Sequence, residues 1–136
     1  MAKLVLFDID GTLVLTGGAG LRAMNRAFDE IVGAPTGLTG ATPTEALEGI
    51  PVAGRTDWSI LQDTLARVGR ELDAPLLGQL RERYVTHLRD EILRPGKGFN
   101  GTLPGVSVLV DALEPREDVY VGLLTGNFSD GARTKL

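Results

Sequence analysis

Two short stretches of the chain carry apolar side chains at successive positions instead of alternating ones. They are AKLVLFD at residues 2–8 and DVYVGLL at residues 118–124, and both are rich in residues that favour β-strands. A strand that is apolar on both faces is typical of a parallel sheet covered by helices on both sides. The pattern therefore predicts two buried strands of an α/β sheet.

Between these strands the apolar positions recur every three or four residues, which is the spacing of an amphipathic helix. Residues 20–32 follow this spacing and end before Gly33. A second helix is predicted for residues 57–69 and a third for residues 74–93. The positions along one side of the first and third helices are Leu21, Met24, Ala27, Phe28, Ile31, Leu76, Leu80, Tyr84, His87 and Leu88.

The remaining segments show weaker patterns. Residues 34–54 are rich in glycine, proline and threonine, which predicts a loop with at most one turn of helix capped by Thr42 or Thr44. Residues 104–114 begin with a proline and predict a further helix. The final stretch, SDGARTKL, is predicted to start another.

The order of these elements predicts an α/β fold with two parts. Residues 1–15 and 99–136 would form a Rossmann-like parallel-sheet core, and residues 16–98 an inserted α-helical cap. Only two strands fall in the core, whereas a doubly wound sheet usually has about five or six. We therefore expect the core to be incomplete, with a further strand following Leu136.

The composition is that of an ordinary soluble globular protein, with 43% hydrophobic and 24% charged residues. Its 14 basic and 18 acidic residues give a net charge of −4 with no dense basic cluster, so no nucleic-acid or membrane partner is expected. The absence of cysteine excludes disulfides and cysteine nucleophiles and fits a cytoplasmic location. The apolar run before Asp8 is too short for a signal peptide or a membrane span.

Each apolar strand ends in a polar cluster. Asp8 and Asp10 follow the first strand, and the tripeptide Thr125-Gly126-Asn127 follows the second. Ligands of open α/β sheets bind beyond the carboxyl ends of the strands, so parallel neighbours would bring both clusters to one pocket. A hydroxyl and turn N–H groups favour an anion there. A divalent cation such as Mg²⁺ would offset the charge of the two carboxylates.

Two acids at one strand end are tolerated best when they do different work. One carboxylate stays ionised and attacks phosphorus, and the other carries a proton for the leaving oxygen. Gly11 permits the turn that follows, which a side chain would obstruct. The cluster predicts phosphoryl chemistry assisted by Mg²⁺.

The stretch FDIDGTLV, residues 7–14, resembles the first motif, DxDGT, of the haloacid dehalogenase superfamily of phosphohydrolases. LLTGN at residues 123–127 resembles the second motif, an apolar strand that ends in Ser or Thr. The helical insert, with GRTDWSIL at 54–61 and LPGVSVLVDAL at 103–113, is similar to the subgroup containing phosphoglycolate phosphatases and β-phosphoglucomutases. The resemblance covers essentially the whole chain. It implies a Mg²⁺-dependent phosphatase for a small phosphorylated metabolite, with phosphoglycolate as the first expectation.

The resemblance also implies roles for single residues. Asp8 would be the nucleophile that forms an aspartyl-phosphate. Asp10 would be the general acid and then the base that activates water, and both would bind Mg²⁺, Asp10 also through its backbone carbonyl. Thr125 would bind the transferring phosphoryl group, assisted by the N–H groups of Gly126 and Asn127.

Other family features bear on the same site. Thr12 is assigned to the phosphate-binding set as support for the loop, and the carboxylate of Asp10 argues for phosphate chemistry over dehalogenation. The third motif of the family is a lysine or arginine, and the fourth is an acidic pair that completes the Mg²⁺ site. Lys135 lies too close to Thr125 in sequence to be the lysine of the third motif. We therefore expect these parts beyond Leu136, and weak or no activity without them.

Three other functions fit parts of the pattern. A phosphotransferase such as a sugar-phosphate mutase would use a second substrate hydroxyl in place of water. A phospho-acceptor signalling domain also uses strand-end aspartates and Mg²⁺, but no long helical insert follows its first strand. The chain would otherwise be an inactive fragment. The sequence leaves the choice of phosphomonoester and the oligomeric state open.

Several residues of the insert have both a functional and a structural interpretation. Arg55, in a polar turn before a helix, would either contact the substrate from the cap or only cap and solvate that turn. Residues 16–18 would form a flexible joint or a plain loop. His87 and Trp58 are predicted to pack within the cap, and the charged run 81–83 to be a solvated helix face.

Overall fold

A computed structural model describes residues 1–33, 45–94 and 96–136. Within these ranges the chain forms four strands and five helices. Their bounds in chain order are β1 Lys3–Phe7, β2 Val14–Thr16, α1 Ala19–Ile31, α2 Asp57–Arg67, α3 Ala74–Glu91, β3 Asn100–Thr102, α4 Val106–Leu113, β4 Val119–Leu123 and α5 Ser129–Lys135. The two proposed caps, Thr42 and Thr44, lie outside the described residues, and residues 46–49 form turns instead of a helix.

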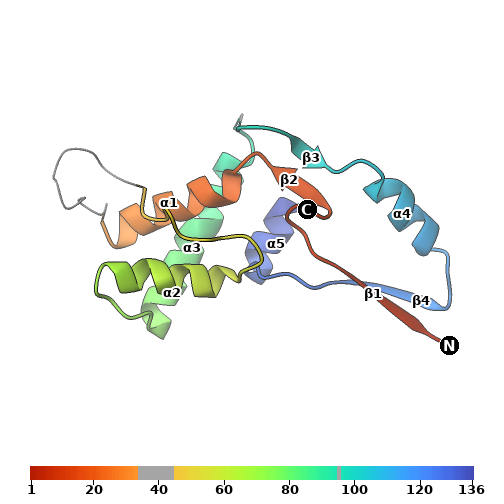
Figure 1. Cartoon of the computed structure of the whole chain (residues 1–136), viewed down its shortest axis with the longest axis horizontal. Helices are drawn as coiled ribbons and strands as arrows, with labels where there is room; N and C mark the ends of the chain where they lie inside the picture. The colour runs from red at the N-terminus through yellow and green to blue at the C-terminus, as the bar shows by residue number, and fades with distance from the viewer. Residues whose placement is uncertain (34–44, 95) are drawn as a thin grey trace.

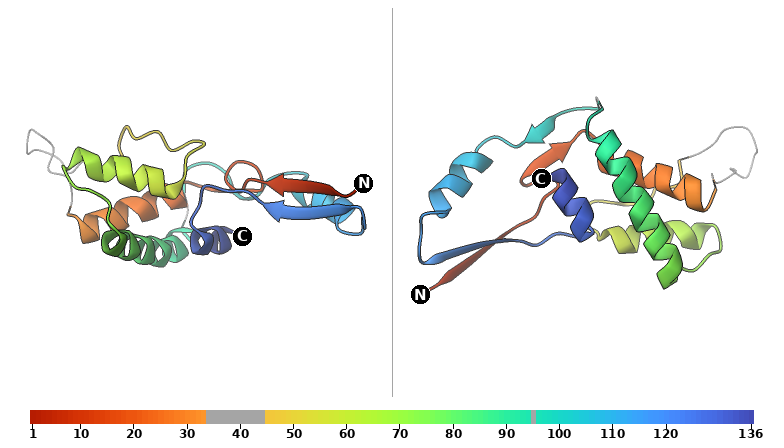
Figure 2. Two further views of the ribbon diagram at one scale, coloured as in Figure 1. Left: turned by 90° about the horizontal axis from the view of Figure 1, so that it is seen from below. Right: turned by 180° about the vertical axis from the view of Figure 1, so that it is seen from behind.

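The helices α1, α2 and α3 lie together at one end of the molecule, while β1, β4 and α4 lie at the other end (Figure 1). Helix α5 lies between the two groups, as the views in Figure 2 also show. The predicted starts of α2 and α3 are confirmed by capping bonds, since Thr56 Oγ1 accepts the N–H of Ser59 and Asp73 Oδ1 accepts that of Leu76. The helix predicted from Pro104 begins at Val106 instead, after Gly105. Among the described residues, no helix has the length and apolar character needed to cross a membrane.

The larger hydrophobic core lies among α1, α2 and α3. Phe28 of α1, Leu65 of α2 and Leu88 of α3 are fully buried in it. All of the predicted inward positions of α3 are buried, which confirms that part of the pattern. Leu21 of α1 differs, because it is 41% exposed and lines a cavity.

Strands β1 and β4 are parallel neighbours, with Phe7 opposite Leu123 at their carboxyl ends. Their predicted burial is wrong within the described residues, since Leu4 is 66% and Tyr120 62% exposed. The reason is that this sheet has two strands, and α4 buries none of its own residues. The fold is a mixed α/β fold with a small parallel sheet, and the Rossmann-like core is partial.

Strands β2 and β3 form an antiparallel pair that the sequence pattern does not predict. Val14 lies opposite Thr102, and each strand has only three residues, VLT and NGT. Runs this short carry no readable alternation of apolar and polar positions. The pair joins the two segments by which the chain enters and leaves the helices α1 to α3 (Figure 1). The division into a core and a cap with the boundaries given above stays a prediction.

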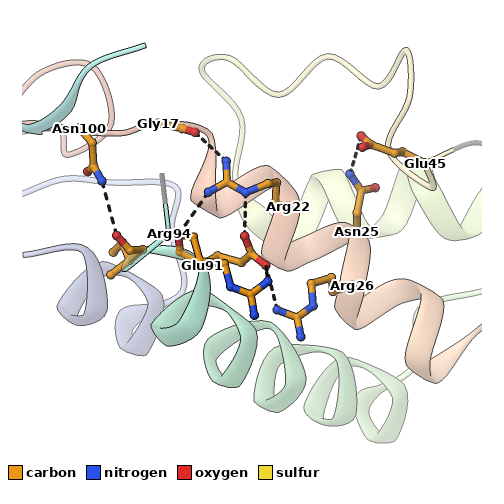
Figure 3. Close-up of polar contacts among 9 residues, drawn as sticks. Gly17, Arg22, Asn25, Arg26, Glu45, Glu91, Arg94 and Asn100 are labelled. Carbon is orange, nitrogen blue, oxygen red and sulfur yellow. Dashed lines mark hydrogen bonds and ion pairs between the residues drawn. The ribbon is translucent and has the colours of Figure 1, made fainter. Parts of the chain in front are cut away.

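A buried acid joins α1 to α3 (Figure 3). The side chain of Glu91 is 4% exposed, and its carboxylate accepts hydrogen bonds from Arg22 Nε at 2.7 Å, Arg26 Nη1 at 2.8 Å and Arg94 Nη1 at 3.3 Å. Arg22 Nη1 also donates to the carbonyl of Gly17 at 2.7 Å. This bond anchors the segment predicted as a joint to the helix pair.

The position of Trp58 differs from the prediction. Its side chain is 45% exposed instead of buried in the helical cap. Trp58 lies in the first turn of α2, at the edge of the face that buries Leu61 and Leu65, where its side chain is only partly covered.

The charged run 81–83 is a solvated helix face only in part, because Glu82 is exposed while its two neighbours are paired. Arg81 Nε lies 3.0 Å from both carboxylate oxygens of Asp130 on α5, and Arg83 pairs with Glu30 on α1. Arg81 and Arg83 therefore connect α3 to its neighbours. His87 is buried as predicted, with Nε2 2.8 Å from Glu30 Oε2.

Candidate active site

The carboxyl ends of β1 and β4 bring the two polar clusters together. The N–H of Leu124 donates to the carbonyl of Phe7 at 2.8 Å, so Asp8 and Thr125 follow paired positions of neighbouring strands. One cavity of about 710 Å³ is lined by residues of both clusters, namely Asp8, Asp10, Gly11, Thr125, Gly126 and Asn127. The structure thus shows the predicted convergence of the two loops.

Asp10 lies at the centre of a polar network. Lys135 Nζ donates to both of its carboxylate oxygens at 2.8 Å, and Asn127 Nδ2 donates to Oδ2 at 2.8 Å. The ring is closed because Asn127 Oδ1 accepts from Lys135 Nζ at 2.6 Å. The Lys135 side chain is 6% exposed, whereas that of Asp10 is 45% exposed and opens to the cavity.

Asp8 has a different environment from Asp10. It is exposed at the end of β1, and its carboxylate makes no hydrogen bond or ion pair with any residue in the described ranges. Nearby, Thr125 Oγ1 accepts from the Asn127 N–H at 3.2 Å and from Asn127 Nδ2 at 2.6 Å. These bonds use the two lone pairs of the hydroxyl and leave its hydrogen to donate. An unencumbered carboxylate beside a hydroxyl donor suits attack on a bound anion.

The turn after Asp10 has the geometry expected of it. Gly11 has a φ of 78°, a left-handed conformation that a side chain would disfavour. Thr12 is exposed and lies outside the cavity lining, and its N–H donates to the carbonyl of Ile9 at 3.2 Å. This position fits support of the loop, and the assignment of Thr12 to the phosphate-binding set stays a prediction.

A second link ties the N-terminus of α2 to the loop after β4. The N–H of Asp57 donates to the carbonyl of Gly126 at 2.8 Å, and Asp57 Oδ2 accepts the N–H of Phe128 at 2.8 Å. Burial raises the pKa of the Asp57 carboxyl, and the bond from Phe128 opposes that shift. A Cβ atom at Gly126 would lie 2.5 Å from the carbonyl oxygen of Arg55, so only glycine fits this close approach.

Arg55, the predicted cap contact, lines the cavity, but its guanidinium is engaged elsewhere. Nη1 donates to the carbonyl of Pro51 at 3.3 Å, and Nη2 donates to that of Ser59 at 3.1 Å. Nη2 also lies 2.8 Å from Asp63 Oδ2. These contacts hold the side chain against the start of α2.

Lys135 is the site residue that sequence reasoning missed. Its closeness to Thr125 in sequence argues against the third-motif lysine. Helix α5 begins at Ser129, and helical side chains lean toward the N-terminus of their helix. A long side chain in the last turn of this short helix therefore reaches back to the loop that precedes it. That geometric rule was the available signal.

The residues present would supply part of the predicted magnesium site. The carboxylates of Asp8 and Asp10 are hard oxygen donors of the kind that Mg²⁺ prefers. In the described parts of the chain, no group of three or more Asp, Glu, His or Cys residues could hold a metal ion. Mg²⁺ is commonly bound through one or two carboxylates together with water and substrate phosphate, so the donors fit an ion shared with the substrate. Because Lys135 contacts the Asp10 carboxylate, Asp10 would hold Mg²⁺ through its backbone carbonyl, as the family resemblance implies.

Comparisons with known proteins show the fold. No protein-family model matches the sequence, and no curated protein matches it. Among solved structures, the chain is similar to a hydrolase from Pseudomonas syringae, with a TM-score of 0.54 and 19% sequence identity. The match covers 99% of this chain and 53% of the other, so this chain spans about half the length of that structure. The two share a fold over that half.

Proposed function

We propose that this site hydrolyses a phosphomonoester with the help of Mg²⁺, through an aspartyl-phosphate formed on Asp8. The observation that carries the proposal is the single cavity into which Asp8, Asp10 and the loop 125–127 all open, with Lys135 beside them. The resemblance of FDIDGTLV to the first haloacid dehalogenase motif supports it. The structural neighbour, described as a hydrolase, agrees with hydrolytic chemistry.

In the first step, a carboxylate oxygen of Asp8 attacks phosphorus, and the bond between phosphorus and the leaving oxygen breaks. Asp10 gives its proton to that oxygen, so the alcohol leaves uncharged. The Thr125 hydroxyl and the Lys135 ammonium donate to the phosphoryl oxygens, where charge concentrates during transfer. Bound Mg²⁺ would neutralise further charge on those oxygens.

The contacts of Lys135 explain how Asp10 is prepared for this step. Its ammonium is shared by Asp10 and Asn127 in the structure. A phosphate dianion competes for the same ammonium, and the move of Lys135 to phosphate frees Asp10 to carry a proton. In the second step Asp10 takes a proton from water, the water oxygen attacks phosphorus, and the bond to Asp8 breaks. The helices of residues 16–98, acting as a cap, would exclude bulk water from both steps.

A phosphate-release assay on a panel of phosphomonoesters, with Mg²⁺ and with a chelator, tests this function. We expect release that depends on Mg²⁺, and a loss of more than about a thousandfold in Asp8→Asn. Asp111→Asn is the matched control, because Asp111 is an exposed acid on α4 outside the cavity. An Asp8→Asn protein as active as the control would refute the proposal. Conversion of a hexose phosphate to its isomer without phosphate release would instead identify a phosphotransferase.

A further inference from the structure

The cavity has one polar end and a long apolar wall. The polar end holds the strand-end acids, the loop after β4 and Lys135. The wall is formed by β2, α1, the segment before α2, α2 itself, α3 and the residue that follows β4. Its apolar members are Leu15, Leu21, Met24, Leu47, Val52, Ala53, Ile60, Tyr84 and Leu124. This wall lies directly beside the place where phosphate would bind, so it would contact the leaving group.

Part of this wall is exposed although it lies inside a cavity. Leu15 is 39% exposed, Leu21 41% and Val52 42%. In the helices beside them, Phe28 and Leu61 are by contrast almost completely buried. Apolar surface left uncovered in a concave site is surface that an apolar ligand would cover.

The charges around the cavity do not suit an acidic leaving group. Of the described residues that line it, the basic ones are Arg55 and Lys135. Arg55 is held by Ser59 and Asp63, and Lys135 faces Asp10 at the phosphate end. The acids Asp8, Asp10 and Asp57 also line the cavity and would repel a carboxylate. A second negative group on the substrate would thus be desolvated without a partner.

We propose that the substrates are phosphomonoesters of an uncharged, largely apolar alcohol. This inference rests on the proposed function and replaces phosphoglycolate, whose leaving group carries a carboxylate, as the expected substrate. The phosphate would bind at Asp8, Thr125 and Lys135, and the alcohol would lie along Leu15, Leu21 and Val52. The site would discriminate against a substrate whose alcohol carries a carboxylate, because that charge would lie against the apolar wall without a partner.

Two measurements with hexyl phosphate and its ω-carboxylate analogue of equal chain length test the inference. Hydrolysis in the presence of Mg²⁺ gives kcat/KM, and calorimetry with the corresponding non-hydrolysable phosphonates gives affinity without turnover. We expect the uncharged chain to be favoured by at least about tenfold in both. Equal or greater kcat/KM or affinity for the carboxylate chain, or no binding of the uncharged phosphonate, would overturn the inference. Preferential binding without hydrolysis of any ester would refute the proposed function and leave the preference standing.

A charge placed on the wall sharpens the test. Val52→Lys should lower the affinity for the uncharged chain and raise that for the carboxylate chain, each by about tenfold. Val68→Lys is the matched control, because Val68 has a similar exposure of 39% and lies outside the cavity lining. Equal effects of the two substitutions would show that the wall does not contact the alcohol.

Discussion

Two acidic residues of this molecule hold basic partners in opposite ways. Glu91, between α1 and α3, has a side chain that is 4% exposed and contacts three arginines (Figure 3). Asp10, at the cavity, is 45% exposed and contacts one lysine. The carboxylate of Glu91 is saturated by its neighbours, whereas that of Asp10 still faces open space.

The difference separates a structural ion cluster from a functional one. A buried carboxylate needs several donors to compensate for lost hydration, and such donors leave no room for a ligand. An exposed carboxylate with a single ammonium partner can exchange that ammonium for another charged group. The hydrogen bond from Arg22 holds the pKa of Glu91 below its usual value, which keeps Glu91 permanently charged near neutral pH. Asp10 and Lys135 can respond to a phosphate.

Of the changes that test the contrast between Asp10 and Glu91, replacement of Lys135 should give the largest effect on activity. Lys135→Met removes one donor to the phosphoryl oxygens and should lower kcat/KM about a hundredfold. The free energy of unfolding should change by less than about 1 kcal/mol, because Asp10 stays hydrated through the cavity. Steady-state kinetics and urea unfolding measure the two quantities. Lys97→Met, at an exposed lysine outside the cavity, serves as the control. Unchanged activity in Lys135→Met would place Lys135 outside the site.

Replacement of Glu91 should show the reverse pattern. Glu91→Gln keeps the shape of the side chain but loses its charged hydrogen bonds, so the free energy of unfolding should fall by about 2 kcal/mol. The cost stays moderate because Arg22 and Arg26 are 33% and 39% exposed and can be hydrated. Urea unfolding measures it, with Glu82→Gln as an exposed control on the same helix. An equal, small effect of both changes would mean that the cluster adds no stability.

The smallest expected effects concern the pH dependence of the free energy of unfolding. The contributions of Glu91 and Asp57 to it should have opposite signs. The pKa of Glu91 is lowered by folding, so its contribution is complete above its usual pKa of 4.5 and is lost as the pH falls further. The pKa of Asp57 is raised by burial, so its contribution is complete below 3.8 and is lost as the pH rises. The free energy of unfolding of Glu91→Gln should therefore approach that of wild type as the pH falls. That of Asp57→Asn should increase relative to wild type as the pH rises. Urea unfolding across this range would contradict the account if both slopes had one sign.

The sequence predicted the elements that depend on a repeated pattern. The spacing of Leu76, Leu80, Tyr84 and Leu88 predicted α3, and the apolar runs predicted β1 and β4 as strands of a parallel sheet, in which the structure makes them neighbours. The positions of Asp8 and Thr125 follow from those strands, since both residues come directly after them. These predictions rest on local periodicity and on the rule that strand ends of a parallel sheet meet at one edge.

Features that depend on the length of a side chain or on a contact between distant elements were not predictable in the same way. Lys135 joins the site because a short helix directs its last side chain backward, and Arg81 is half-buried because Asp130 of another helix meets it. The prediction that β1 is buried was wrong because an apolar run does not determine how many layers of structure cover the strand. Tertiary contacts decide such cases, and a single sequence does not contain them explicitly.

The central claim is that Asp8 attacks phosphorus within a pocket shared by both strand-end loops. Acid quenching of the protein during turnover of a phosphomonoester with Mg²⁺, followed by peptide mass spectrometry, tests it directly. We predict a phosphoryl group on the peptide that contains Asp8, and its absence in Asp8→Asn. Turnover with the phosphoryl group on another residue would contradict the claim.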